Sequence, residues 1–69
     1  MTVMKLTVNG EPMALPAGAT VGALIEHLGL AGKRLAIELN EDIVPRSQHA
    51  DTALAEGDQI EVVRAIGGG

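Results

Sequence analysis

Apolar and polar residues alternate at the start of the chain. From Met4 to Val8 every second side chain is apolar, which is the period of a half-buried β-strand and suggests a strand over Val3–Val8. The Asn9-Gly10 dipeptide suits the positive φ angles of a type I′ turn, and residues 11–15 then resume the alternation. The pattern therefore predicts that the chain opens with a β-hairpin.

Helical spacing begins after a break at the Pro-Ala-Gly segment. Thr20 occupies the position of an N-cap, and Gly29 is suited to end a helix as its C′ residue. The apolar residues between them recur on one helical face: Val21, Leu24, Ile25 and Leu28. We predict a helix over residues 20–29. Gly22 within it costs about 1 kcal/mol relative to Ala, which we attribute to close packing of the helix on the sheet.

Further strands are predicted in the second half of the chain. Residues 34–40 alternate again, and a short apolar pair, Ile43-Val44, is ended by the following proline. Residues 59–66 predict the last strand, whereas residues 46–56 have no regular period and predict a loop or a helical turn. Three apolar residues of that loop are expected to cover the core: Ala50, Ala53 and Leu54. Turns are expected at Glu41-Asp42 and Glu56-Gly57-Asp58.

A hairpin, one helix and then further strands form an α+β pattern, with one main helix packed across a small mixed sheet. This is the element order of the β-grasp, or ubiquitin-like, fold. With 69 residues the chain has room for a single small domain. We expect that domain over residues 1–66 and a flexible C-terminal glycine tail over residues 67–69.

Composition narrows the possible functions. Because 46% of the residues are apolar and 20% are charged, the domain should fold alone. The absence of cysteine excludes disulfides, thiolate metal sites and thiol nucleophiles, and the absence of aromatic residues together with a net charge of −4 argues against nucleic-acid binding. No signal peptide and no apolar run of about 20 residues is present, so we expect a soluble cytoplasmic protein without a membrane segment.

The strongest functional signal is the terminal Gly67-Gly68-Gly69. An ordinary explanation for such an end is fraying. These glycines, however, directly follow a predicted central strand, and a tail without Cβ atoms can thread a narrow channel in another protein. Residues 66–69 could carry a terminal carboxylate about 13 Å beyond the sheet. Attack of that carboxylate on the α-phosphate of ATP would give an acyl-adenylate that a sulfur or nitrogen nucleophile can displace.

Other candidate residues have simpler explanations. His27 is expected on the surface at the end of the helix, and His49 in the loop, because neither can be paired with a nucleophile. No ligand spacing indicates a metal site, and the paired carboxylates are explained by turn chemistry. The sequence therefore predicts a protein without catalytic residues and without a bound cofactor.

The whole chain resembles the ThiS family, the sulfur carriers of thiamin thiazole biosynthesis. The resemblance rests on the following segments: Val8-Asn9-Gly10, Gly18-Ala19-Thr20-Val21, Leu39-Asn40, Ile43-Val44-Pro45-Arg46, Gly57-Asp58-Gln59-Ile60-Glu61 and the glycine tail. The chain departs from the family at His49, where members often have an aromatic residue, whereas three terminal glycines in place of two occur among relatives.

The resemblance implies a carrier that catalyses nothing itself. Gly69 would be adenylated by a ThiF-like enzyme that uses ATP, and would then become a thiocarboxylate. Its sulfur would come from cysteine through a cysteine desulfurase or persulfide protein and would pass to a ThiG-like thiazole synthase. Gly67 and Gly68 would thread the partner's active site. A carrier that visits two enzymes in turn is expected to be monomeric when free.

A candidate docking surface for the partner enzymes is also predicted. Val63 and Ala65 would give a modest apolar patch beside the tail, and we include Ile66 and Arg46 in the candidate docking surface. The competing interpretation of Arg46 is a solvated side chain after a proline that ends the strand.

Three alternative functions remain open for the chain: a MoaD-like small subunit of molybdopterin synthase, a ubiquitin-like protein modifier that joins Gly69 to a lysine, and an interaction module with an inert tail.

Overall fold

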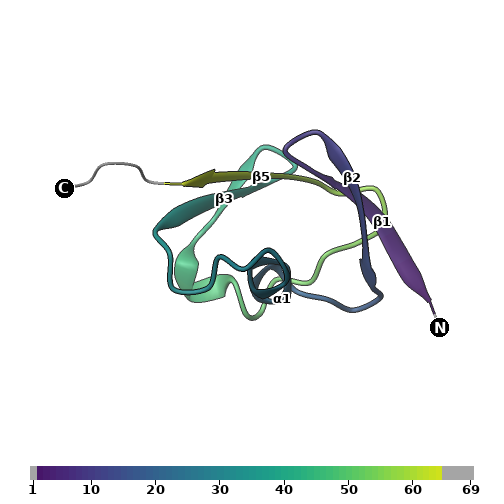
Figure 1. Cartoon of the computed structure of the whole chain (residues 1–69), viewed down its shortest axis with the longest axis horizontal. Helices are drawn as coiled ribbons and strands as arrows, with labels where there is room; N and C mark the ends of the chain where they lie inside the picture. The colour runs from purple at the N-terminus through teal and green to yellow at the C-terminus, as the bar shows by residue number, and fades with distance from the viewer. Residues whose placement is uncertain (1, 65–69) are drawn as a thin grey trace.

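The computed structural model describes residues 2–64 and contains five strands, one α-helix and one short 3₁₀ helix. In chain order these are β1 (Val3–Val8), β2 (Glu11–Pro16), α1 (Val21–His27), β3 (Leu35–Leu39), β4 (Asp42–Val44), η1 (Arg46–Gln48) and β5 (Gln59–Arg64). The strands form one sheet in the order β2-β1-β5-β3-β4, and α1 crosses one face of it (Figure 1). The predicted α+β architecture is confirmed.

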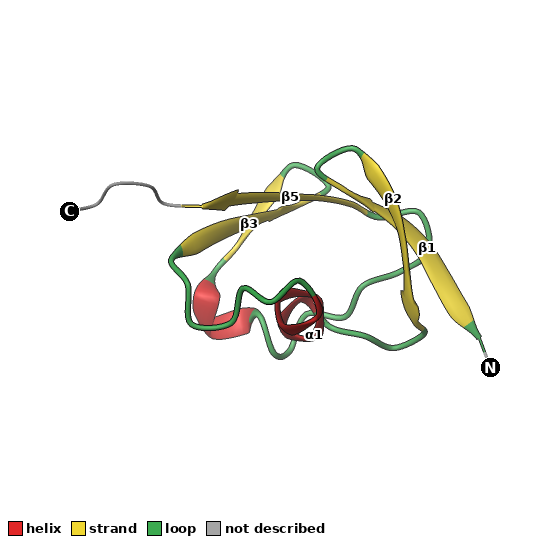
Figure 2. Ribbon diagram, in the orientation of Figure 1, coloured by secondary structure: helices red, strands yellow, loops and turns green. Residues whose placement is uncertain are grey.

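The sheet is mixed because its central strand pairs differently on its two sides. β5 runs parallel to β1, with Val8 opposite Ile60, and antiparallel to β3, with Leu39 opposite the same residue. Figure 2 shows β5 between β1 and β3, with α1 below the sheet. The predicted central position of the last strand is therefore correct for its described part, Gln59–Arg64.

The core lies between the sheet and α1. Its buried side chains come from every strand, from α1 and from the loop before β5: Met4, Leu6, Val8, Leu15, Val21, Leu24, Ile25, Ile37, Val44, Leu54 and Ile60. Leu24, Ile37 and Ile60 have no exposed surface. No charged or polar side chain is buried within residues 2–64, so the core is held by apolar burial.

The predicted helix is confirmed, although it is shorter at both ends. Thr20 is the N-cap, and its Oγ1 accepts a hydrogen bond from the backbone N–H of Ala23 at 3.2 Å. Leu28 is the C-cap, and Gly29 follows with a φ of +73°. The helix ends there because a glycine adopts the left-handed conformation without steric cost.

Gly22 corrects one prediction, because it faces a loop and not the sheet. Its backbone N–H donates to the carbonyl of His49 at 2.8 Å, and a Cβ at this position would lie 3.5 Å from the Cα of Ala50. Next to it, the N–H of Val21 donates to the carbonyl of Thr52 at 2.9 Å. The loop before β5 thus accepts two N–H groups that the first turn of a helix leaves without partners.

Two loop predictions are also corrected. Ala50 and Ala53 are exposed, and of the three apolar residues expected to cover the core only Leu54 does so. The turn after β3 is formed by Asn40 and Glu41, with φ angles of 52° and 75°, so that Asp42 already belongs to β4. Asn tolerates the left-handed conformation, which explains why the turn begins one residue earlier than predicted.

A bilayer-spanning helix is not found in the described part of the chain, since no helix there has the necessary length and apolar character.

Candidate functional site

The C-terminal segment leaves the domain from the central strand of the sheet. The last described residue, Arg64, lies opposite Leu35 of β3. In Figure 1 the start of β1 and the end of β5 lie at opposite ends of the sheet. The predicted carrier residue Gly69, the predicted threading residues Gly67 and Gly68, and the predicted docking residues Ala65 and Ile66 lie outside the described residues, and their roles stay predictions.

The side chain of Asn9 holds β5 after the neighbouring strand β1 has ended. The backbone N–H of Asn9 donates to the carbonyl of Ile60 at 2.8 Å, and its Oδ1 accepts from the N–H of Val62 at 2.8 Å. The side chain therefore replaces the backbone carbonyl that a longer β1 would supply. Asn9 also has a φ of 52°, and Gly10 has a φ of 82°, as a type I′ turn requires.

Substitutions at Asn9 separate its two roles. Asn9→Gly keeps the left-handed conformation but removes the acceptor of the Val62 N–H, so we expect a loss of about 1 kcal/mol in the free energy of unfolding. Asn9→Asp keeps both the acceptor and tolerance of that conformation, and should lose less. Urea unfolding measures both, and hydrogen exchange should be accelerated at Val62 in Asn9→Gly alone. Equal stability of the two variants would show that the Asn9 Oδ1 contact contributes nothing.

A second side-chain network fixes the start of β5. Asn40 exchanges two hydrogen bonds with the backbone of Gln59: its N–H donates to the carbonyl at 2.7 Å and its Oδ1 accepts from the N–H at 2.9 Å. Asn40 Nδ2 donates to Asp58 Oδ1 at 3.1 Å, and Asp58 Oδ2 accepts from the N–H of Ala55 at 2.8 Å. Two segments that carry the family resemblance, Leu39-Asn40 and Gly57-Asp58-Gln59, are thus brought together to position the strand that precedes the tail.

The outer face of the sheet, opposite α1, carries exposed apolar side chains on β5 and β4. Val63 is 56% exposed and lies opposite Ala36 of β3. Ile43 on β4 is 63% exposed, and it was not predicted as a docking residue. A signal for it exists in the sequence, because Val44 is buried and adjacent residues of a strand point to opposite faces. Val63 therefore lies on the exposed surface that its predicted docking role requires.

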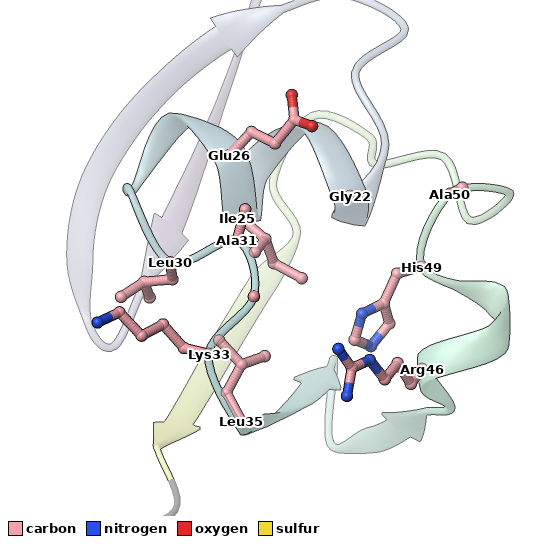
Figure 3. A pocket seen from close by; sticks show the side chains of 11 residues that line it. Gly22, Ile25, Glu26, Leu30, Ala31, Lys33, Leu35, Arg46, His49 and Ala50 are labelled. Atoms are coloured by element: carbon pink, nitrogen blue, oxygen red, sulfur yellow. The ribbon is translucent and has the colours of Figure 1, made fainter.

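Arg46 and His49 lie on the helix side of the sheet, at the edge of a cavity of about 260 Å³ (Figure 3). Arg46 begins η1, where β4 has been ended by Pro45, and its side chain is exposed. His49 is half-buried, and its Nε2 donates to the carbonyl of Val44 at 3.1 Å. His49 thus ties η1 to β4, while His27 is exposed in the last turn of α1. Arg46 is separated from Val63 by the thickness of the sheet, so the two do not share one face.

Comparison with known proteins identifies the family. The model of the ThiS family matches residues 6–69. The chain belongs to the ThiS family. It is 38% identical to the sulfur carrier protein ThiS of Escherichia coli, over 96% of this chain and 100% of that protein.

A solved structure of a ThiS protein confirms the fold. The crystal structure of a thiamine biosynthesis protein (ThiS) from Geobacter metallireducens superposes with a TM-score of 0.81 at 32% identity, covering 96% of this chain and all of the other. The β-grasp, ubiquitin-like prediction is therefore correct, and ThiS is a family of small sulfur carrier proteins.

Longer relatives also match the ThiS-like chain. It is 46% identical, over 96% of its length, to a protein of Paramagnetospirillum magneticum named thiazole synthase. The chain spans about a fifth of that relative, 20% of its length, and the same fraction of a second thiazole synthase from Magnetococcus marinus.

Among residues 2–64 no group of three His, Asp or Glu side chains converges on a point where a metal ion could bind. The carboxylates of the Asp58 turn are occupied with backbone and amide hydrogen bonds, as turn chemistry predicts.

Proposed function

We propose that the chain is a sulfur carrier of thiamin biosynthesis and that the α-carboxyl of Gly69 is the position that carries sulfur. Membership of the ThiS family supports this proposal. The observation that supports it most directly is the anchoring of β5. This strand is paired on both sides and held by Asn9 and Asn40, so that the five residues after Arg64 follow an anchored strand in the sequence.

The proposed chemistry uses this chain as a co-substrate and not as an enzyme. A carboxylate oxygen of Gly69 attacks the α-phosphorus of ATP in a ThiF-like adenylating enzyme, and pyrophosphate leaves. The outer sulfur of a persulfide, held by a cysteine desulfurase or a persulfide protein, then attacks the acyl carbon, and AMP leaves with the former carboxylate oxygen. A thiol cleaves the S–S bond of the resulting acyl disulfide: it forms a disulfide with the donor's sulfur and releases the thiocarboxylate. ATP is bound by the partner, and this chain supplies the acyl group, Gly67 and Gly68 forming the slender segment that enters the active site.

The proposed sulfur acceptor is a ThiG-like thiazole synthase. The two relatives named thiazole synthase support this choice, because about a fifth of each is similar to nearly the whole of this chain. A carrier-like segment and a synthase name therefore occur on one polypeptide in those organisms. This association favours the thiazole pathway over a MoaD-like role or a role as a protein modifier.

The predicted docking residues are Val63, Ala65, Ile66 and Arg46. Because Arg46 lies on the helix side of the sheet, the apolar docking face that we propose contains Val63 and not Arg46, and the structure adds Ile43 to it as a further exposed apolar residue. We expect Val63→Asp to lower kcat/KM for adenylation about tenfold, because a carboxylate in an apolar interface must be desolvated. Val3→Asp is the matched control, since Val3 is 54% exposed on β1, far from the end of β5. Pyrophosphate release measures both. If both variants are adenylated equally, Val63 does not lie in the interface.

The intact mass of the protein tests the proposed function. The chain is incubated with ATP, a persulfide source and the adenylating enzyme of the thiazole pathway, and is then analysed by mass spectrometry. Replacement of one oxygen by sulfur, located at Gly69 by fragmentation, is the expected result. The same measurement on protein isolated from cells tests whether Gly69 has a free carboxyl group. Modification only by the molybdopterin-pathway enzyme would overturn the proposed acceptor, and inertness toward both enzymes would overturn the carrier function.

A further inference from the structure

The basic residues of the chain are gathered at the end of the sheet from which the C-terminal segment leaves. Arg64 is the last described residue of β5 and lies opposite Leu35, the first residue of β3. Lys33 and Arg34 directly precede Leu35. On the other side of β3, Val44 lies opposite Ile37, so that Arg46, two residues later, reaches the same end of the sheet. We call Lys33, Arg34, Arg46 and Arg64 the basic cluster.

The cluster contains four of the five basic residues of a protein whose net charge is −4. All four side chains are exposed. The fifth, Lys5, lies on β1.

Three members of the cluster line cavities on the helix side of the sheet. Lys33 and Arg46 line the cavity of about 260 Å³, together with Leu35 (Figure 3). Arg64 lines a second cavity of about 340 Å³, and Leu30 borders both. Glu26 also lines the first cavity, but its carboxylate points away from the guanidinium group of Arg46 in Figure 3. The two cavities thus lie on either side of the segment that leads to β3.

Acidic residues occupy the opposite end of the same two strands. Glu41 and Asp42 lie at the turn between β3 and β4, and Glu56 and Asp58 lie in the turn before β5. Glu38 and Glu61 lie opposite each other in the middle of the two strands, and Glu11 lines the second cavity with Arg64. Along β3 and β5 the basic residues therefore lie at the end where β5 finishes, and the acidic residues lie in the middle and at the other end. Gathering like charges at one end opposes folding, and the fold does not require it, because none of the four side chains is buried.

We propose that the basic cluster docks on a carboxylate-rich rim around the channel of the adenylating enzyme that receives the tail. This inference rests on the proposed function. Five residues follow Arg64, and at about 3.3 Å each they reach at most about 17 Å. When Gly69 reaches the reacting nucleotide at the bottom of the channel, the cluster must therefore lie at its mouth, where carboxylates of the partner provide complementary charge.

Distance also decides which anion the cluster meets. With the tail fully extended, the α-phosphate of ATP meets Gly69 about 17 Å beyond Arg64, farther than the side chains at residues 33–34, 46 and 64 extend. The cluster instead meets the protein surface at the entrance of the channel. Complementary charges at the rim of an interface act mainly on the association rate and depend strongly on salt. The cluster would orient the carrier, because its positive charges lie at the same end of the sheet as the tail that must enter the channel.

The test compares two variants with the same change in net charge. Arg34→Gln combined with Arg64→Gln removes two positive charges from the cluster, whereas Lys5→Glu changes the charge by the same amount on β1. We expect kcat/KM for pyrophosphate release to fall about tenfold or more in the double variant at low salt, with kcat unchanged and a shallower dependence on salt. Lys5→Glu should keep the kinetics of the unaltered protein. Thermal unfolding of both variants checks that the domain is intact.

Each outcome bears on the proposal. Equal losses in the two variants would show an effect of net charge alone, and no loss in either would show that the cluster does not dock; both results overturn the inference. Binding to the adenylating enzyme without ATP separates the inference from the proposed function. Cluster-dependent binding without any mass change at Gly69 would contradict the proposed function and support the docking site. Thiocarboxylate formation together with binding that does not depend on the cluster would support the proposed function and contradict the docking site.

Discussion

Deletion of Gly68 and Gly69 is expected to abolish thiocarboxylate formation while leaving the domain folded. The new terminal carboxylate, on Gly67, would lie about 6 to 7 Å short of the position of Gly69 in an extended tail. A displacement of about 1 Å from the reacting position can cost about a hundredfold in rate, so no modified product should be detectable by intact mass in the time that converts the full chain. Thermal unfolding should be unchanged, because the hydrogen bonds that fix β5 involve residues up to 64.

The shortened chain provides its own control for docking. Its sheet surface and its basic cluster are intact, and it should therefore inhibit adenylation of the full-length chain competitively. Combining the deletion with Val63→Asp should remove that inhibition. Conversion of the shortened chain at Gly67 at a rate near that of the full chain would contradict the proposed role of Gly69. Absence of inhibition would instead place the binding energy in the two deleted glycines.

Local features of the fold were predictable from the sequence because each depends on neighbouring residues. Asn9-Gly10 is a turn signal whatever lies elsewhere, and the structure confirms positive φ angles at both positions. Thr20 and Gly29 mark the ends of the helix through their own backbone preferences. The alternation around Ile37 and Ile60 fixes which residues of β3 and β5 are buried.

Features that depend on a distant partner could not be predicted in the same way. Gly22 lies against the backbone of Ala50, and no property of the helix sequence indicates that neighbour. The Oδ1 of Asn9 accepts a hydrogen bond from the N–H of Val62, 53 positions along the chain. The turn alone explains an asparagine at this position, so nothing in the sequence indicates that it also holds β5. Ala50 and Ala53 were wrongly assigned to the core, because a segment without a regular period carries no information about which side faces inward.

The candidate site also has features that the sequence predicts and features that only the strand pairing reveals. The glycine tail and the Val-Pro-Arg segment are visible in the sequence, whereas the exposed position of Ile43 and the gathering of Arg46 and Arg64 at one end of the sheet follow from strand pairing. Register is a property of the pairing partners and the turns between them. The proposed reacting group at the terminus is therefore recognised from sequence more easily than the proposed docking surface.

Substitution of Ile60 by alanine has the largest expected effect on stability. Ile60 is fully buried in the central strand, opposite Val8 on one side and Leu39 on the other. Removing its side chain deletes apolar burial and leaves a cavity that packed strands on both sides cannot close, which should cost about 2 to 5 kcal/mol. Domains of this length are stabilised by only about 3 to 10 kcal/mol in total. Urea unfolding should therefore show a midpoint lowered by a large fraction of its original value.

Ile43→Ala is the matched control for that loss. The same side chain is removed from the same sheet, but Ile43 is 63% exposed on β4, and the expected loss is below about 1 kcal/mol. The two variants should also differ in function: the less stable variant should keep its affinity for the adenylating enzyme, and the more stable variant should lose affinity. Below the unfolding temperature the Ile60 variant should still be adenylated in proportion to its folded fraction. The Ile43 variant should show a raised KM with a normal melting curve, because Ile43 lies on the proposed docking face. Equal destabilisation by the two substitutions would contradict the assignment of Ile60 to the core, because the difference in burial is what separates them.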